Sequence, residues 1–197
     1  TGTGAVATVT GVGFAPDLVH TQTKNTAGVN FFADRLRSPN KVLEPQATDA
    51  EYTAGSNVFT MDGMLCTPYS SYWDSANPYI NHFFKRAKGF FDVVAYTGTG
   101  VARTVNHNLG VVPEMMIVKA RTGTATPNWI VYHKDAWGFG TDGYLNFDML
   151  VLNSSGRAGQ SNSATFNSTQ PTSSTISLGT YLSNSPDTYV AYLFATL

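Results

Sequence analysis

The sequence has little charge and almost no cysteine. Asp, Glu, Lys and Arg make up 13% of the 197 residues, about half the usual share, and the formal net charge is −1. A chain so close to neutral lacks the basic surface that nucleic acids and anionic membranes attract, so neither is predicted as a partner. The single cysteine, Cys66, excludes an internal disulfide. No base neighbours it, and we predict a small buried residue rather than a nucleophile.

Long apolar runs and helical periodicity are also missing. No run approaches the roughly 18 residues that a membrane span needs, so no membrane insertion is predicted. Short β-branched or aromatic runs instead alternate with clusters of Gly, Pro, Asn and Ser. This alternation is typical of sandwiches and barrels, and it predicts an all-β protein.

What the chain does contain is an internal repeat. Residues 1–16 read TGTGAVATVTGVGFAP, and residues 97–113 read TGTGVARTVNHNLGVVP. The ends of the two copies also correspond, since residues 79–84 (YINHFF) align with residues 189–194 (YVAYLF). A repeat of roughly a hundred residues is too long for a solenoid turn and has the size of a small domain. We predict two tandem, similar β-sandwich modules of jelly-roll type, residues 1–87 and 88–197.

Strands can be placed from the apolar alternation, with about six or seven in each copy, as a β-sandwich requires. In the second copy the predicted strands are residues 92–96, 103–106, 115–120, 129–133, 145–152, 175–179 and 188–194. In the first copy they are residues 7–10, 18–21, 29–33, 41–43, 57–61 and 79–84. Residues 153–174 are rich in Ser, Asn, Thr and Gly, and are predicted to form a long surface excursion or to be partly disordered.

The strand at residues 92–96 precedes the second TGTG, whereas the first TGTG has no such lead-in. We therefore interpret the chain as a piece of a longer tandem array, or as a processed fragment of one. An open sheet edge is an aggregation hazard unless it is covered. The edge of the first copy is accordingly predicted to receive a partner chain or a substitute segment.

Motifs for catalysis are weak throughout. Residues 2–7 (GTGAVA) imitate a dinucleotide fingerprint, but a β-branched run follows in place of the required helix, so no cofactor is predicted. The histidines are His20, His82, His107 and His133. No two of them stand at ligand spacing, so no metal site is predicted. We expect no catalytic residue and no enzyme activity.

Aromatic residues in polar loops carry the clearest signal of binding. Ring faces pack on the apolar faces of sugars while nearby polar groups take the hydroxyls. The candidate carbohydrate-binding residues are Tyr72, Trp73, Asp74, Asn77, Trp137 and Asp142. The alternative, left open here, is that these rings cover the end of a sandwich or an inter-subunit contact.

Several strings resemble repeat modules of tailed phages, especially phages of marine bacteria and cyanobacteria. They are residues 13–19 (GFAPDLV), 48–51 (TDAE), 89–100 (GFFDVVAYTGTG), 106–119 (NHNLGVVPEMMIVK) and 189–195 (YVAYLFA). The first copy departs from these modules after Val19, where HTQT replaces a strand of Trp-Ile-Lys type. The resemblance implies virion surface, fibre or appendage proteins, and it carries no catalytic residue.

From this resemblance we expect a virion structural protein, a tail fibre or a particle-surface appendage, that mediates host attachment by binding a surface glycan. Its expected location is the virion surface. The expected partners are other virion proteins or copies of the chain itself, a trimer among the options. Two alternatives stay open: a purely structural capsid-decoration module, and a tailspike-like enzyme that cuts surface polysaccharide.

Overall fold

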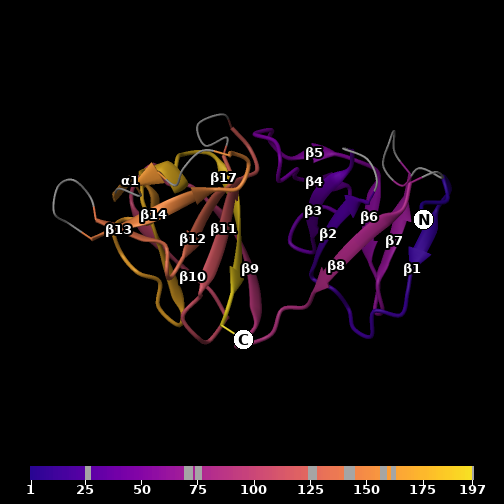
Figure 1. Cartoon of the computed structure of the whole chain (residues 1–197), viewed down its shortest axis with the longest axis horizontal. Coiled ribbons are helices and arrows are strands. Elements are labelled where there is room, and N and C mark those ends of the chain that lie inside the picture. The colour runs from indigo at the N-terminus through magenta and orange to yellow at the C-terminus, as the bar shows by residue number, and fades with distance from the viewer. Residues whose placement is uncertain are drawn as a thin grey trace. The chain divides into compact units, whose positions relative to one another are not determined.

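A computed structural model describes residues 1–24, 28–68, 73, 77–123, 128–139, 145–155, 159–160 and 163–196. The chain forms two compact units (Figure 1). The first comprises Thr1–Pro45 and Glu51–Arg86, and the second comprises Gln46–Ala50 and Ala87–Leu197. Both are built from strands, which confirms the all-β prediction. No helix among the described residues is long and apolar enough to cross a membrane.

The first unit contains two small antiparallel sheets and a short β-ladder. One sheet has the order β3-β2-β8 and the other the order β1-β7-β6, while β4 pairs with β5. The strands are β1 (Ala7–Val9), β2 (Leu18–Thr23), β3 (Asn30–Asp34), β4 (Lys41–Val42), β5 (Tyr52–Thr53), β6 (Ser56–Phe59), β7 (Met64–Thr67) and β8 (Tyr79–Phe84).

The core of the first unit lies between its two sheets. Val19 and Phe31 come from one sheet, and Met64 and Cys66 from the other. These side chains are buried because alternate residues of a strand point to the same face, so each sheet presents one apolar face to its neighbour. The first unit is therefore a β-sandwich.

The second unit has a larger sheet, with the order β13-β14-β12-β11-β17-β9, and a small one in which β10 pairs with β16. Its strands are β9 (Phe91–Thr97), β10 (Arg103–Asn106), β11 (Met115–Ala120), β12 (Ile130–His133), β13 (Trp137–Phe139), β14 (Leu145–Val151), β15 (Gly159–Gln160), β16 (Thr175–Leu178) and β17 (Thr188–Phe194). A short helix α1 (Ser163–Phe166) and a 3-10 turn η1 (Thr180–Leu182) complete it.

The repeat extends to the hydrogen-bonding register. Leu18 in β2 pairs with Phe84 in β8, and the corresponding Met115 in β11 pairs with Phe194 in β17. The backbone N–H of Gly2 donates to the carbonyl of Asn77 at 2.9 Å. The N–H of Gly98 donates to the carbonyl of Asp187 at 2.8 Å, so the same bond recurs in the second copy. The prediction of two similar tandem modules is confirmed.

The predicted lead-in strand is also confirmed. β9 pairs with β17 along its whole length, from Phe91↔Phe194 to Thr97↔Thr188. β17 thus lies between β9 and β11, and five consecutive residues of it are fully buried, Tyr189 to Leu193. Because β17 is covered on both faces and at both edges, its sequence is almost continuously apolar.

Several features differ from the prediction, since the short strands β5, β7, β13 and β15 were not predicted. β7 was missed, because its four residues, MLCT, stand between turn signals on both sides. The stretch 153–174 was predicted to be a surface excursion or partly disordered, yet Phe166 from α1 is 1% exposed and packs edge-on against Tyr132 at 5.7 Å. A single apolar ring therefore fixes part of this polar segment to the core.

Candidate functional site

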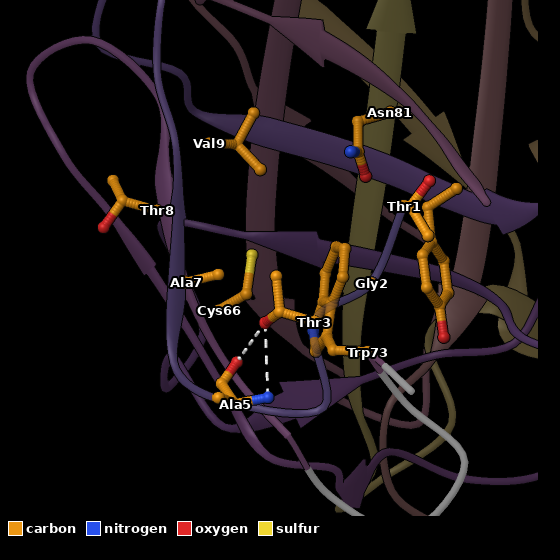
Figure 2. A pocket seen from close by; sticks show the side chains of 11 residues that line it. Thr1, Gly2, Thr3, Ala5, Ala7, Thr8, Val9, Cys66, Trp73 and Asn81 are labelled. Atoms are coloured by element: carbon orange, nitrogen blue, oxygen red, sulfur yellow. Dashed lines mark hydrogen bonds between the residues drawn. The ribbon is translucent and has the colours of Figure 1, made fainter. Parts of the chain in front are cut away.

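A pocket of about 210 Å³ opens in the first unit, between β1 and β8 (Figure 2). β1 follows the TGTG segment, and β8 ends the other sheet, so the pocket lies where the two sheets meet at one side of the sandwich. Its lining consists of Thr1, Gly2, Thr3, Ala5, Ala7, Thr8, Val9, Cys66, Trp73, Tyr79 and Asn81.

The two faces of β1 differ at the pocket. Figure 2 shows the side chains of Ala7 and Val9 on the pocket side and that of Thr8 on the other side. Thr8 is exposed, whereas Ala7 and Val9 are half-buried, as the alternation of a strand requires. The Thr3 hydroxyl bonds its own loop, donating to the carbonyl of Ala5 at 2.9 Å. The pocket wall on this side is therefore mainly apolar.

Trp73 forms the aromatic part of the wall. Its side chain is 6% exposed and packs at 5.0 Å from the Tyr79 ring and edge-on against Phe31 at 6.1 Å. The indole N–H donates to Oδ1 of Asn57 at 3.3 Å. The Trp73 carbonyl accepts the N–H of Gly4 at 3.1 Å, which holds the TGTG segment against the ring.

Cys66 lies at the inner end of the pocket and is 2% exposed. Burial raises the pKa of its thiol to about 12, so the thiolate that a nucleophile needs is disfavoured at neutral pH. The thiol donates weakly to the carbonyl of Met64 at 3.9 Å. Cys66 therefore acts as a small apolar residue, as predicted.

Asn81 supplies the polar part of the wall. It stands on the same face of β8 as Tyr79, and its Oδ1 accepts the hydroxyl of the fully buried Thr21 at 2.8 Å. That bond fixes the amide against β2. The pocket thus combines aromatic, thiol and aliphatic surface with one oriented amide.

Two overlapping parts of the chain, residues 1–89 and residues 85–197, match the family described as Domain of unknown function (DUF7483). The chain belongs to the DUF7483 family. Comparisons with curated proteins and with solved structures gave no match. The second DUF7483 match includes β9, and the first ends just before it.

The structure corrects one of the sequence-predicted sugar-binding residues. Trp73 was predicted to present an exposed ring, but in the first DUF7483 domain its indole is part of the core, because Tyr79, Phe31 and Asn57 surround it. Asn77 is half-buried and lies two residues before β8, where its carbonyl accepts the N–H of Gly2. Sequence reasoning could not place Trp73, because a lone aromatic residue in a polar stretch has no periodicity.

The other predicted sugar-binding residues are not tested. Tyr72, Asp74 and Asp142 lie outside the described residues. Trp137 lies in β13, the end strand of the larger sheet of the second DUF7483 domain, and only its backbone is described. The pocket residues Ala7 and Asn81 were missed, and their only sequence signal was that both lie in segments of the repeat.

Among the described residues, one cluster with metal-ligand chemistry occurs, in the second DUF7483 domain. Glu114, His133 and Asp135 bring one potential ligand atom each within 4.8 Å. Glu114 also lies 3.7 Å from the ammonium of Lys134, and its carbonyl accepts the Lys134 N–H at 2.8 Å.

The corresponding site of the first DUF7483 domain has an ion pair but lacks the histidine. Arg35 lies 3.2 Å from the carboxylate of Asp17 and donates its N–H to the Asp17 carbonyl. The Glu114–Lys134 and Asp17–Arg35 contacts are thus corresponding ion pairs, and each links two strands. The described residues around them give no further sign of a metal.

Proposed function

We propose that the chain is a structural module of a phage particle surface, part of a tail fibre or another appendage, and that it acts by binding rather than catalysis. The observation that carries this proposal is the repetition of one β-sandwich with the same backbone register in both copies. Tandem domains build long objects in which many weak contacts add up through effective concentration. The resemblance of the repeated strings to phage modules supports the proposed location.

The surface chemistry supports a protein that works outside the cell. Charged residues are 13% of the sequence, and Thr, Ser and Asn occupy many of the remaining polar positions. Such a surface is well hydrated without a strong electrostatic field, so it avoids nonspecific binding to charged polymers. A repeated appendage exposed at high copy number benefits from this property.

Attachment to a host glycan is the second part of the proposal. Trp73 does not supply an exposed ring, so the glycan contact is proposed to rest on Trp137 and Asp142 of the second unit. Among the described residues β13 pairs with β14 alone, and this edge position supports Trp137. An aromatic ring stacks on a sugar while carboxylates take the hydroxyls.

The position on the particle is tested by labelling. Antibodies raised against the purified chain, used on intact particles of the phage that encodes it, should label a fibre or appendage in electron micrographs. Label on the head shell would support the capsid-decoration alternative. Complete absence of label from disrupted particles would overturn the assignment to a virion.

The attachment role is tested by competition. Purified chain should reduce adsorption of the phage to its host, and Trp137→Ala should lower binding to host polysaccharide by about tenfold or more. Trp137→Phe keeps a ring and is the matched control. Equal binding by all three proteins would remove the glycan part of the proposal. Release of sugar fragments by the purified chain would favour the enzyme alternative.

A further inference from the structure

The pocket adjoins the end of a sheet. Tyr79 and Asn81, which line it, belong to β8, and among the described residues β8 pairs with β2 alone. The edge of β8 that faces away from β2 is therefore not covered by a strand in the part of the chain that the structure describes. Figure 1 shows β8 beside β2 at the end of this sheet.

In the second unit, the strand edge that corresponds to the outer edge of β8 is covered by another strand. β17 corresponds to β8 residue by residue, because both pair with the corresponding partner strand in the same register. Tyr79 corresponds to Tyr189, and Asn81 corresponds to Ala191. In the second unit the outer edge of β17 is occupied by β9, with Tyr96 opposite Tyr189 and Val94 opposite Ala191.

Two inward side chains of β9 join the core of the second unit. The Tyr96 ring is 9% exposed, stacks on Tyr189 at 5.0 Å and donates its hydroxyl to the carbonyl of Leu182 at 2.9 Å. Val94 packs against the same core. The pocket of the first unit thus corresponds to the position that the inward side chains of β9 occupy in the second unit.

In the first unit, residues outside any such strand make some of the contacts that β9 makes in the second unit. Trp73 packs at 5.0 Å on Tyr79, as Tyr96 does on Tyr189. The Asp62 carboxylate accepts the N–H groups of Gly11 and Gly13, whereas Asp92 of β9 accepts the N–H of Asn108 in the second unit. Neither substitute occupies the space beside Asn81, Ala7 and Val9, and this space remains as the pocket.

Burial differs accordingly between the corresponding strands. Val190, Ala191 and Tyr192 in β17 are fully buried. In β8, Ile80 is 37% exposed, His82 is exposed and Asn81 is half-buried. A strand with apolar and aromatic residues and an uncovered edge is a template for the addition of another strand.

We propose that the pocket and the outer edge of β8 form a docking groove for an extended peptide strand of the β9 type. The strand would run antiparallel to β8, as β9 does to β17. Its aliphatic residue opposite Asn81 would enter the pocket between Val9 and Trp73. Its aromatic residue opposite Tyr79 would pack beside Trp73. This inference does not depend on the proposed function, because it rests on the comparison of the two units.

The first test uses the peptide of residues 89–97, GFFDVVAYT, as the probe for the full chain. We expect saturable binding, measured by fluorescence anisotropy of a labelled peptide. Hydrogen exchange should show new protection of the β8 backbone. A scrambled peptide and a peptide with Val94→Asp should bind about tenfold or more weakly. Protection at β17 instead of β8 would mean exchange with the resident β9 and would overturn the proposal.

A matched pair of variants locates the site. Ala7→Phe fills the pocket from β1 and should weaken peptide binding by about tenfold or more, whereas Val58→Phe in β6, at a residue that is 39% exposed and outside the pocket lining, should leave it unchanged. Circular dichroism checks that both variants fold. Equal effects of the two substitutions would contradict a groove at the pocket. Binding of an oligosaccharide that Ala7→Phe abolishes, without any strand binding, would also overturn it.

Fusion provides a second measurement that does not need a high peptide concentration. The sequence FFDVVAY is placed directly before Thr1, which reproduces the order of β9 and TGTG in the second unit and raises the effective concentration of the strand. The fusion should raise the thermal midpoint of the first unit and protect β8 from exchange. A scrambled fusion should do neither. Absence of β8 protection with both the peptide and the fusion overturns the proposal.

Discussion

At the scale of single residues, the first unit places charge in its interior. The side chains of Arg37 and Asp34 are fully buried, with the guanidinium Nε 2.6 Å from Asp34 Oδ2. Arg37 also lies 3.4 Å from Glu51 and donates to the carbonyl of Phe32 at 2.9 Å. Burying ions costs much solvation free energy, which this arrangement offsets only because each partner is satisfied. The trio therefore ties β3 to the start of β5.

Replacing Arg37 tests how much this buried ion cluster contributes to the stability of the first unit. Arg37→Met leaves the Asp34 carboxylate buried without its ion partner, so the free energy of unfolding of the first unit should fall by about 3–5 kcal/mol. Urea denaturation measures the change. Lys41→Met removes a cation on the adjacent β4 that contacts the Thr53 hydroxyl at an exposed site, and it should change stability by about 0.5 kcal/mol or less. Similar losses in the two variants would contradict this account.

His20 makes the first unit sensitive to acid. Its ring stacks on Phe32 at 4.7 Å and on His82 at 5.6 Å. Burial lowers the pKa of His20 below the ordinary 6.5, and His82 adds to this, although the hydrogen bond with Asn30 opposes it. The unfolded chain then binds the proton more readily than the folded one. Stability is unaffected above pH 6.5 and is lost as the pH falls through the folded pKa.

The test compares the chain with His20→Ile, since Ile117 occupies the corresponding position in the second unit. Stability of the unchanged protein should decline as the pH falls below the ordinary histidine value of 6.5. The variant should show a shallower decline, measured by urea denaturation at each pH. His107, whose pKa burial also lowers, is present in both proteins, so the difference reports His20. Identical slopes would rule out His20 as the origin.

At the scale of elements, turns decide which strands can meet. The Asp62–Gly63 turn joins β6 to β7, and the Thr60 N–H donates to the Gly63 carbonyl at 2.9 Å. Gly63 has φ +149°, and a Cβ there would lie 2.0 Å from the carbonyl oxygen of Val9 in β1. Only glycine lets the turn approach β1 this closely, so this residue sets the pairing of β1 with β7.

Gly63→Ala should therefore disturb a whole sheet rather than one turn. The added methyl group meets backbone atoms that cannot rotate away, and the free energy of unfolding of the first unit should fall by about 3 kcal/mol or more. Gly13→Ala is the control: φ is +82°, but no atom lies within 4 Å of the added carbon, so only about 1–2 kcal/mol is expected. Chemical denaturation compares the two. A larger loss of stability in Gly13→Ala than in Gly63→Ala would contradict this expectation.

At the scale of the whole molecule, the two units have separate cores. Val19, Phe31 and Met64 belong to one cluster of buried residues, and Tyr132, Phe166 and Tyr189 belong to another. Among the described residues, none belongs to both clusters. Each core is thus expected to melt by its own cooperative transition, although the copies belong to one family.

Hydrogen exchange followed by mass spectrometry during thermal unfolding can assign the transitions. Arg37→Met should lower the midpoint of peptides from the first unit by about 10 °C or more, and leave those of the second unit unchanged. Phe166→Ala should do the reverse, because losing a buried ring costs about 3–5 kcal/mol in the second core. Leu152→Ala, at a side chain that is 46% exposed, is the control for that unit. Parallel shifts in both units would indicate a single cooperative molecule.

The sequence by itself determined the β class, the tandem repeat and many of the strands. These follow from local properties: alternation sets the face of each residue, and the TGTG segments mark corresponding points of the two copies. The strand at Tyr79–Phe84 was predicted with its observed bounds, and its match to β17 extends to the register. The exposure of the candidate aromatic residues could not be evaluated this way, because loop aromatics have no period that reveals it.

Tertiary structure decided which side chains share a site. Trp73 lies inside because Phe31, Asn57 and Tyr79, all distant or loop-separated in sequence, surround it. The pocket exists because β1 and β8 lie on opposite sheets and no strand like β9 closes the edge of β8 among the described residues. Contacts of this kind depend on how strands from remote segments are ordered in space, and that order is set by packing and hydrogen bonding of the whole domain rather than by local propensity.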